Sequence, residues 1–338
     1  MKRFALVLAL VFAATCLIVG VSPAQEKTIS LRFSTFFPPT HPLAVITNDW
    51  CKEVEKRTNG RVKVKQYGGA TLTSPVQTYD SVVQGVVDAG NMVLGYTMGK
   101  FPLSEVLDYP LGYPNATVAH KLANAYYAKF KPKEFDDVKV MYFHGQTPGI
   151  LHTKSRPVTK LEDLKGMKIR TQGTNAKFMQ LLGGIPVAMP MGDAYDAINK
   201  GVADGIMCAD EVLKSWKIGE VVKYTTQNYA SAYTSIFLVA MNKNKWASIK
   251  PEDQKIIEQI NTEWIDRSAK VWEQIDKEGQ EFAKKRGIKV TKLSPEEDAR
   301  WAAKAQPLYD EYVKNMKAKG LPGEEVLKFV RNFLKTNK

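Results

Sequence analysis

A ten-residue pattern that occurs twice constrains the fold of this chain more than any other feature. Residues 79–88 read YDSVVQGVVD and residues 195–204 read YDAINKGVAD, so that five residues recur at the same internal spacing. In each copy a short helix is expected to end at a glycine, which takes the left-handed conformation common at helix C-termini. A valine-rich strand is expected to follow at once. The repeat predicts two similar α/β lobes; the alternative is a chance match of common residues.

Further segments fit an alternation of strands and helices. Strands are expected over residues 29–33, 61–66, 138–143 and 235–241, with a helix over residues 42–58 that ends before an Asn-Gly pair. Such alternation favours mostly parallel sheets, whose ligands lie at the carboxyl ends of the strands. The sequence therefore predicts an α/β fold.

The last third of the chain has a different character. Apolar residues between positions 251 and 285 recur at helical spacing. At about 1.5 Å per residue this helix would be roughly 50 Å long, longer than either lobe, and we expect it to brace both. Ser294 before Pro295 predicts the N-terminus of another helix. The tryptophans of this region are expected to lie in the core.

The first 24 residues are typical of a secretory signal. Lys2 and Arg3 precede an apolar run over residues 4–21, and small residues stand at Ser22 and Ala24. We expect cleavage after Ala24. The apolar run is about long enough to cross a bilayer, so an uncleaved anchor is the alternative.

The charge of the chain does not indicate nucleic-acid binding. Without the signal, 46 basic residues stand against 35 acidic ones. The lysines alternate with acidic residues along helical segments, as on solvated faces, and no stripe of arginines with stacking aromatics accompanies them. Cys51 and Cys208 form no disulfide framework and no metal-ligand spacing. We expect a monomer without cofactor or metal.

Enzyme signatures are absent from the sequence. It contains no phosphate-binding glycine loop, no dinucleotide fingerprint, no HExxH and no GxSxG. His144 and His152 could line a cleft, but hydrogen-bonded structural histidines are commoner. A catalytic triad scattered along the chain stays an alternative, because triads are defined by geometry rather than order.

Arg170 is the strongest candidate for a ligand-binding residue. Residues 161–170 read LEDLKGMKIR, which predicts a short helix ending at Gly166, a strand over residues 167–169, and Arg170 at its carboxyl end. Ligand-facing groups belong there in an α/β lobe. The guanidinium offers a planar fork that matches a carboxylate and stays charged. A surface salt bridge is the alternative role.

The chain resembles the DctP-type solute receptors of tripartite ATP-independent periplasmic (TRAP) transporters over almost all of its length after the signal. The stretches that carry the resemblance are FPPTHPLA at 37–44, TNGRVKV at 58–64, QGVVDAG at 84–90, LEDLKGMKIR at 161–170, GGIPVAMPMGDAYDAINKGVADGI at 183–206 and WASIKPEDQKII at 246–257.

This resemblance implies a two-lobed periplasmic binding protein fold, type II-like, with mixed sheets and the long helix packed across both lobes. It implies lobe 1 at residues 25–145, joined by part of 230–260, lobe 2 at 146–230, and the C-terminal helices at 250–338. It also implies closure over an organic acid, delivery to a TRAP membrane permease, and no catalysis. Arg170 matches the carboxylate-binding arginine of the family. The other residues expected near the ligand are Phe37, Asn91, Tyr96, Gln172, Met189, Cys208 and Tyr233.

Two departures from the family pattern bear on the ligand. Ile150 stands where members that bind sugar acids tend to carry a second arginine, and Cys208 stands where many members carry an asparagine. Both make the pocket less polar, and unpaired polar groups are costly when buried. We expect a rather apolar monocarboxylate, aromatic or branched, or a 2-oxoacid. A dicarboxylate stays an alternative if His144, His152 or a turn rich in backbone N–H groups holds its second carboxylate.

Other functions remain open at this stage. A receptor for a different importer or for a sensor would share the two-lobed form, and a periplasmic enzyme acting on small acids would share the cleft. Glu211 could hold a cation or orient Arg170, although a position on a helix surface is expected.

Overall fold

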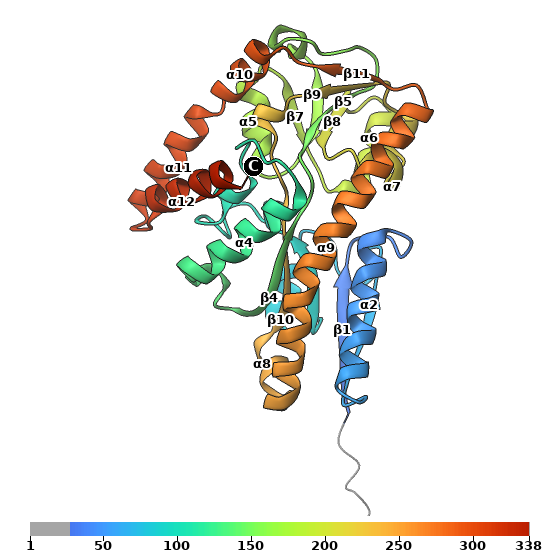
Figure 1. The fold of residues 1–338 in the computed structure, drawn as a ribbon, viewed down its shortest axis with the longest axis vertical. Coiled ribbons are helices and arrows are strands. Elements are labelled where there is room, and N and C mark those ends of the chain that lie inside the picture. The colour runs from blue at the N-terminus through green and yellow to red at the C-terminus, as the bar shows by residue number, and fades with distance from the viewer. Residues whose placement is uncertain (1–27, 338) are drawn as a thin grey trace, which may run out of the picture.

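The structure, a computed structural model, describes residues 28–337 and is built on two β-sheets (Figure 1). The expected signal sequence over residues 1–24 lies outside the described residues. The first sheet has the strand order β2-β1-β3-β10-β4 and the second the order β11-β9-β5-β8-β6-β7. The strands are β1 Ile29–Thr35, β2 Val62–Tyr67, β3 Ala89–Val93, β4 Val138–Gly145, β5 Ile150–Thr153, β6 Lys168–Thr171, β7 Ile185–Ala188, β8 Gly205–Cys208, β9 Tyr224–Gln227, β10 Ile236–Asn242 and β11 Lys289–Lys292.

Both sheets mix parallel and antiparallel pairs. In the first sheet β1 is parallel to β2 and β3, whereas β10 is antiparallel to β3 and β4. In the second, β6 is parallel to β7 and β8, and β5 is antiparallel to β8 and β9. The four strands expected from the sequence are present as β1, β2, β4 and β10, within two residues at each end. The mixed, two-lobed α/β architecture is confirmed.

The sequence repeat corresponds to a repeated structure. Asp88 and Asp204 each accept a hydrogen bond from the backbone N–H of a neighbouring strand, at Arg32 (2.7 Å) and Lys168 (2.8 Å). Each also donates its own N–H to the carbonyl of that same residue. The expectation that a valine-rich strand follows the glycine at once was wrong. The valines lie in the turn, and the strands begin one residue after each aspartate because its side chain ties the turn to the neighbouring strand.

Helices cover both sheets. They are α2 Pro42–Arg57, α3 Thr78–Val83, α4 Ala116–Phe130, α5 Asn175–Leu181, α6 Ala194–Asn199, α7 Val212–Ser215, α8 Lys243–Ala247, α9 Pro251–Lys285, α10 Pro295–Ala303, α11 Gln306–Ala318 and α12 Gly323–Thr336. Ser294 caps α10 by accepting from the N–H of Glu297, as expected from the sequence. Among residues 28–337, no helix combines the length and the apolar character required to cross a membrane.

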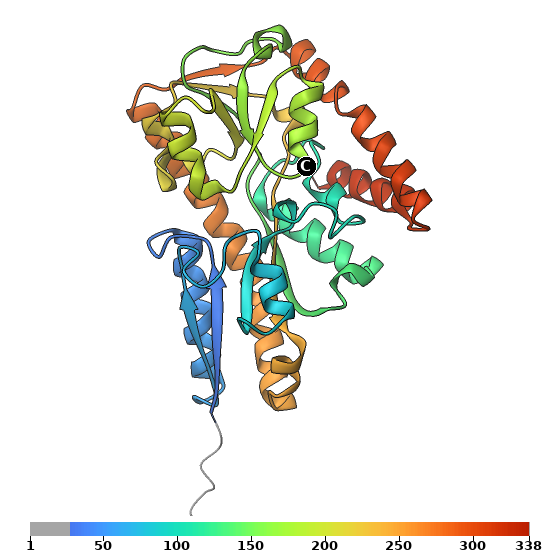
Figure 2. The same ribbon diagram turned by 180° about the vertical axis from the view of Figure 1, so that it is seen from behind.

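Helix α9 runs along both sheets, as expected (Figures 1 and 2). Its first half packs on α2, where Trp50 Nε1 donates to Asn261 (2.9 Å) and Trp264 Nε1 donates to the carbonyl of Ile46 (2.9 Å). Its second half reaches α7 beside the second sheet. There Gly279 permits close approach, because a Cβ on this glycine would lie 2.1 Å from the carbonyl oxygen of Asp210.

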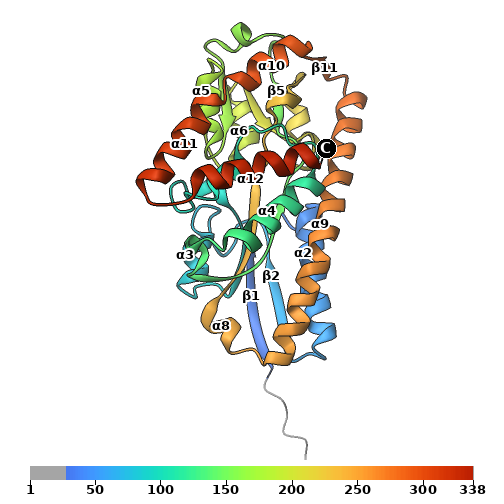
Figure 3. The same ribbon diagram turned by 60° about the vertical axis from the view of Figure 1, so that its left-hand side comes forward.

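The last three helices lie along one side of the molecule (Figure 3). Their tyrosines bind backbone carbonyls of the first lobe, from Tyr309 to Pro110 and from Tyr312 to Leu103, each at 2.8 Å. Trp264, Trp272 and Trp301 are all buried, as expected for core residues. The C-terminal helices therefore fix the loop between β3 and α4, which contacts the start of β10.

A buried carboxyl group at Asp108 joins that loop to β10. Its Oδ1 accepts a hydrogen bond from the N–H of Ile236 at 2.7 Å, and its own carbonyl accepts from Asn175 on α5 (3.4 Å). Burial raises the pKa of Asp108 to about 8, because a charged carboxylate is disfavoured away from water.

This shift predicts a stability that falls as pH rises. An unfolded aspartate releases its proton near pH ~3.9, whereas folded Asp108 keeps its proton up to about pH 8. The stabilisation is complete at low pH and is lost as pH rises through this window. Asp108→Asn keeps a side-chain oxygen that can accept the hydrogen bond from Ile236, but its amide does not ionise. We expect the free energy of unfolding of the wild type to fall by about 2 kcal/mol or more relative to the variant between pH 5 and pH 8, as measured by denaturant unfolding.

Asp49→Asn on the exposed face of α2 is the control for this experiment. Equal pH profiles of stability for wild type and Asp108→Asn would contradict the prediction.

Candidate ligand-binding site

A small cavity lies where the ends of strands from the two sheets face each other. Its volume is about 20 Å³, room for roughly one water molecule. Five residues expected from the sequence line it: Phe37, Tyr96, Arg170, Gln172 and Cys208. The others that line it, which sequence reasoning did not place at the ligand, are Phe36, Val93, Gln146, Met191, Glu211, Trp216, Ser235, Phe237 and Trp272.

Arg170 lies on β6 between β7 and β8, and its residue is only 1% exposed. Its Nε and Nη2 both donate to the carbonyl oxygen of Met189, at 3.1 and 2.7 Å. This contact fixes one edge of the guanidinium. The other edge, formed by Nη1 and Nη2, keeps donors for an anion. Among residues 28–337, no acidic side chain forms an ion pair with Arg170.

Three polar contacts join the lobes around the cavity. The hydroxyl of Tyr96, after β3, accepts from the backbone N–H of Met191 at 3.0 Å. Burial raises the pKa of Tyr96, and the neighbouring Arg170 charge opposes that rise, so the hydroxyl is neutral beside the guanidinium. The Gln172 side chain donates to the hydroxyl of Ser235. The third contact, between His41 and Glu211, spans 3.5 Å from Nε2 to Oε2.

Glu211 was expected on a helix surface, and that expectation was wrong. Its residue is 2% exposed and lines the cavity. The close approach of α9 covers the segment after β8, a tertiary contact that local sequence cannot reveal. Beside it, Cys208 donates weakly from Sγ to Oε1 of Gln146 at 3.8 Å. Burial raises the pKa of Cys208 to about 11, so this side chain is a neutral thiol.

Aromatic rings form most of the remaining wall. Phe36 lies nearly parallel to Phe237 (9°) and to Trp216 (19°), with ring centroids 6.3 Å away in both cases. Phe237 in turn contacts Trp272 with centroids 5.3 Å apart. These rings come from the β1–α2 loop, β10, the end of α7 and α9. The wall therefore offers flat, apolar faces that favour another ring.

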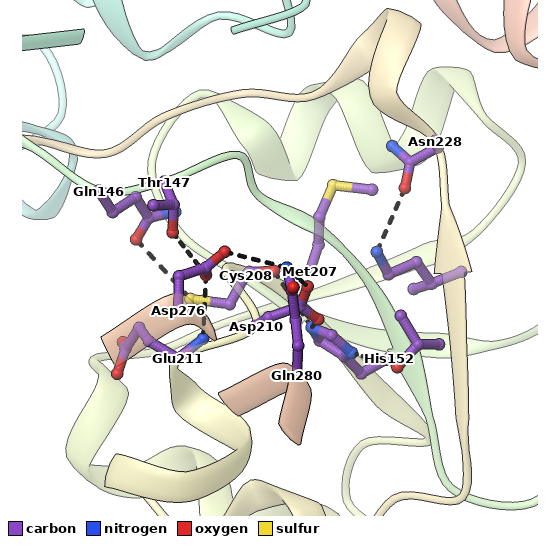
Figure 4. A network of polar contacts seen from close by, with 12 residues as sticks. Gln146, Thr147, His152, Met207, Cys208, Asp210, Glu211, Asn228, Asp276 and Gln280 are labelled. Atoms are coloured by element: carbon purple, nitrogen blue, oxygen red, sulfur yellow. Dashed lines mark hydrogen bonds and ion pairs between the residues drawn. The ribbon is translucent and has the colours of Figure 1, made fainter. Parts of the chain in front are cut away.

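A carboxyl group on α9 joins two segments that contribute residues to the cavity lining (Figure 4). Oδ1 of Asp276 accepts from the hydroxyl of Thr147 (2.6 Å) and from the backbone N–H of Glu211 (3.2 Å). Gln280 donates both to Asp276 and to Asp210. Burial, reinforced by the negative charge of Asp210, raises the pKa of Asp276 to about 7. Asp276 therefore fixes two cavity segments to one helix: the crossover with Gln146 and the turn with Glu211.

Three of the residues expected near the ligand lie outside the cavity lining. Asn91 accepts a hydrogen bond from His144 (3.2 Å) within the first sheet. Tyr233 is fully buried and donates to the carbonyl of Met207 (2.8 Å). Met189 contributes only the carbonyl that holds Arg170. A direct contact of these three with a ligand stays a prediction.

Both candidate histidines have structural partners, the commoner case expected from the sequence. Trp272 Nε1 donates to Nδ1 of His144 at 3.1 Å, and burial holds the His144 pKa well below its usual value. His152 contacts the hydroxyl of Thr225 (2.9 Å) and the carbonyl of Cys208 (3.3 Å). Neither lines the cavity. Within residues 28–337, no group of three or more His, Cys, Asp or Glu side chains is arranged to hold a metal ion.

The chain is similar to proteins of one family. The profile of bacterial extracellular solute-binding proteins, family 7 (DctP), matches residues 33–315. A TRAP periplasmic solute-binding protein from Desulfovibrio salexigens is 34% identical, with a TM-score of 0.80, covering 90% of this chain and 95% of that one.

Two further solved structures contain bound acids. A TRAP solute-binding protein from Rhodoferax ferrireducens, in complex with copurified benzoate, is 29% identical with a TM-score of 0.85, covering 91% of this chain and 98% of that one. A marine metagenome protein specific for aromatic acid ligands, in complex with 3-hydroxybenzoate, is 28% identical with a TM-score of 0.86, covering 92% and 99%. This chain therefore belongs to the DctP family of bacterial extracellular solute-binding proteins, as a periplasmic binding protein of the TRAP type.

Proposed function

We propose that this protein binds an aromatic monocarboxylate through Arg170 and delivers it to a TRAP membrane permease. The observation that carries the proposal is a buried guanidinium without an acidic partner. Arg170 is 1% exposed, and no carboxylate among the described residues pairs with it. A buried charge is costly unless it is paired. A ligand carboxylate would supply the missing anion on the free edge of the fork.

The rings around Arg170 favour an aromatic body on that acid. Phe36, Trp216 and Phe237 present nearly parallel faces to one another beside the guanidinium. A sugar acid would need several hydrogen-bond partners for its hydroxyls, and the cavity wall is mostly apolar. Two structural relatives at 28–29% identity have benzoate and 3-hydroxybenzoate bound, which agrees with this class.

The charges favour one carboxylate over two. Arg170 is the only lysine or arginine that lines the cavity among the described residues, and Glu211 lines it as well. A second ligand carboxylate would be repelled by Glu211. His144 and His152, which could have held it, lie outside the cavity lining and already have protein partners. These observations support a monocarboxylate rather than a dicarboxylate.

Binding is proposed to occur with closure of the lobes, and without chemistry on the ligand. The cavity of about 20 Å³ is smaller than an aromatic acid, so the side chains that line it would have to move apart around a ligand. The ligand would enter an open form, pair with Arg170, and favour a closed form because only there do all its contacts exist. Export through the signal sequence and action as a monomer belong to the same proposal. A receptor of this kind returns its ligand unchanged.

The substrate class can be tested with a thermal-shift screen of the purified protein freed of bound ligand. We expect benzoate and related aromatic monocarboxylates to raise the melting temperature, because a ligand that binds only the native state stabilises it. Succinate and glucuronate should give smaller shifts. Mass spectrometry should recover the ligand unchanged. Larger shifts from dicarboxylates or uronates than from any aromatic acid would contradict the proposal.

The role of Arg170 is tested by substitution. Arg170→Ala should weaken benzoate binding by about 2–5 kcal/mol, since the ligand carboxylate would be desolvated without a partner. Arg170→Lys should recover only part of this, because it lacks the planar fork. Isothermal titration calorimetry measures both. Lys168→Ala, which removes an exposed positive charge from the same strand, is the matched control and should bind normally. Unchanged affinity in Arg170→Ala would exclude the assignment.

A further inference from the structure

Glu211 is a second buried charge in the cavity, and carboxylate binding by Arg170 does not use it. The residue is 2% exposed and borders the same small space as Arg170. The two side chains are not within ion-pair distance of each other. The cavity therefore has a positive site and a separate negative site, and a ligand held by Arg170 has to be compatible with both.

The carboxylate of Glu211 has capacity for one more donor. Its Oε2 accepts from the hydroxyl of Ser215 and lies 3.5 Å from Nε2 of His41. No protein group among residues 28–337 donates to the other oxygen, Oε1. Oε1 is not among the fully buried atoms that lack a partner, so it is open to the cavity, and a ligand that displaces water from it has to donate in the place of that water.

Gln146 supplies the complementary group. Its side chain lines the same cavity, its residue is 4% exposed, and its Oε1 is occupied by the Cys208 thiol at 3.8 Å. Its Nε2 is buried and donates to no acceptor in the part of the chain that the structure describes. The wall of the cavity thus contains an acceptor and a donor that are both unused.

The positions of these two groups are fixed by one side chain. Asp276 accepts from Thr147, the residue after Gln146, and from the backbone N–H of Glu211 (Figure 4). In Figure 4 the carboxylate of Glu211 points away from Asp276. The acceptor and the donor are therefore held on two segments tied to the same point of α9.

We propose that Glu211 and Gln146 together bind a hydroxyl group on the ligand, which donates to Glu211 and accepts from Gln146. A hydroxyl is the small group that does both. An ammonium group could donate to Glu211 but could not accept from Gln146. This inference rests on the proposed function and narrows it, so that the preferred ligand is an aromatic monocarboxylate that carries a hydroxyl.

The test compares benzoate with its three monohydroxy isomers and with mandelate by isothermal titration calorimetry. Wild type should bind at least one hydroxy acid about 10- to 100-fold more tightly than benzoate, the range expected for a hydrogen bond to a charged group. Glu211→Gln, which keeps the shape and removes the charge, should lower this preference about tenfold. The preference is measured as the ratio of the two affinities within each variant, so that a general change in the binding of aromatic acids cancels.

A second variant and a control distinguish the loss of the hydroxyl site from a general loss of folding or binding. Gln146→Met should lower the same ratio of hydroxy-acid affinity to benzoate affinity about 3- to 10-fold. Glu220→Gln, which removes an exposed acidic charge from the same lobe, should leave the preference unchanged. Melting curves of each variant verify that it is folded.

The possible outcomes distinguish this inference from the proposed function. If benzoate and every hydroxy acid bind wild type within about twofold of one another, or if Glu211→Gln leaves the preference intact, the hydroxyl site is wrong and the aromatic receptor stands. Tighter binding of 3-(aminomethyl)benzoate than of any hydroxy acid would also overturn the hydroxyl site, in favour of a cationic group. If no aromatic acid binds at all, the proposed function fails and the hydroxyl site with it.

Discussion

One buried cation, Arg170, dominates the electrostatics of the cavity and has no acidic partner among the described residues. Arg170 cannot turn toward solvent, because the Met189 carbonyl holds its Nε and Nη2 and strands lie on both sides of β6. Its charge is therefore desolvated by the fold itself. The aromatic rings around it lower the local dielectric, which strengthens attraction to any anion that enters and raises the cost of leaving the site empty. The proposed affinity for a carboxylate would follow from this unpaired charge and would require no other charged residue.

A rigid support explains how such a site keeps its geometry. Helix α9 contacts α2 through Trp264 and the turn after β8 through Gly279 and Asp276, so a single helix bridges both lobes. The Asp276 carboxyl accepts from the crossover and from Glu211 at the same oxygen. A shift of the second lobe relative to α9 would change both contacts together. Motion that opens the cavity is therefore expected to occur on its opposite side, where Tyr96 and Met191 meet.

The sequence predicted the strands and helices better than it predicted the residues that line the cavity. The repeat, the strands and the long helix were predictable because turn glycines and apolar periodicity are local signals. Arg170 was predictable because it ends a short motif. In contrast, Trp272 and Glu211 reach the cavity only because α9 packs against the turn after β8. Periodicity assigned Trp272 to the core, which is correct, but could not show that this part of the core borders the ligand. Glu211 was misplaced for the same reason, since nothing in its local sequence indicates which element will cover it.

The two buried charges also affect the equilibrium between open and closed lobes. In this structure the contacts between the two sides of the cavity include two neutral ones, Tyr96 with Met191 and Gln172 with Ser235. Against them stand an unpaired guanidinium at Arg170 and an incompletely bonded carboxylate at Glu211, both better solvated when the lobes part. A ligand that pairs with both charges removes the cost of burying them, and it can do so only in the closed form. Such a ligand binds the closed form more tightly than the open form, and this difference in affinity shifts the population toward closure. An acid that pairs with Arg170 alone would leave the cost of burying the Glu211 carboxylate, which opposes closure. In the proposed mechanism the residues that select the ligand are therefore the same ones that make closure depend on it.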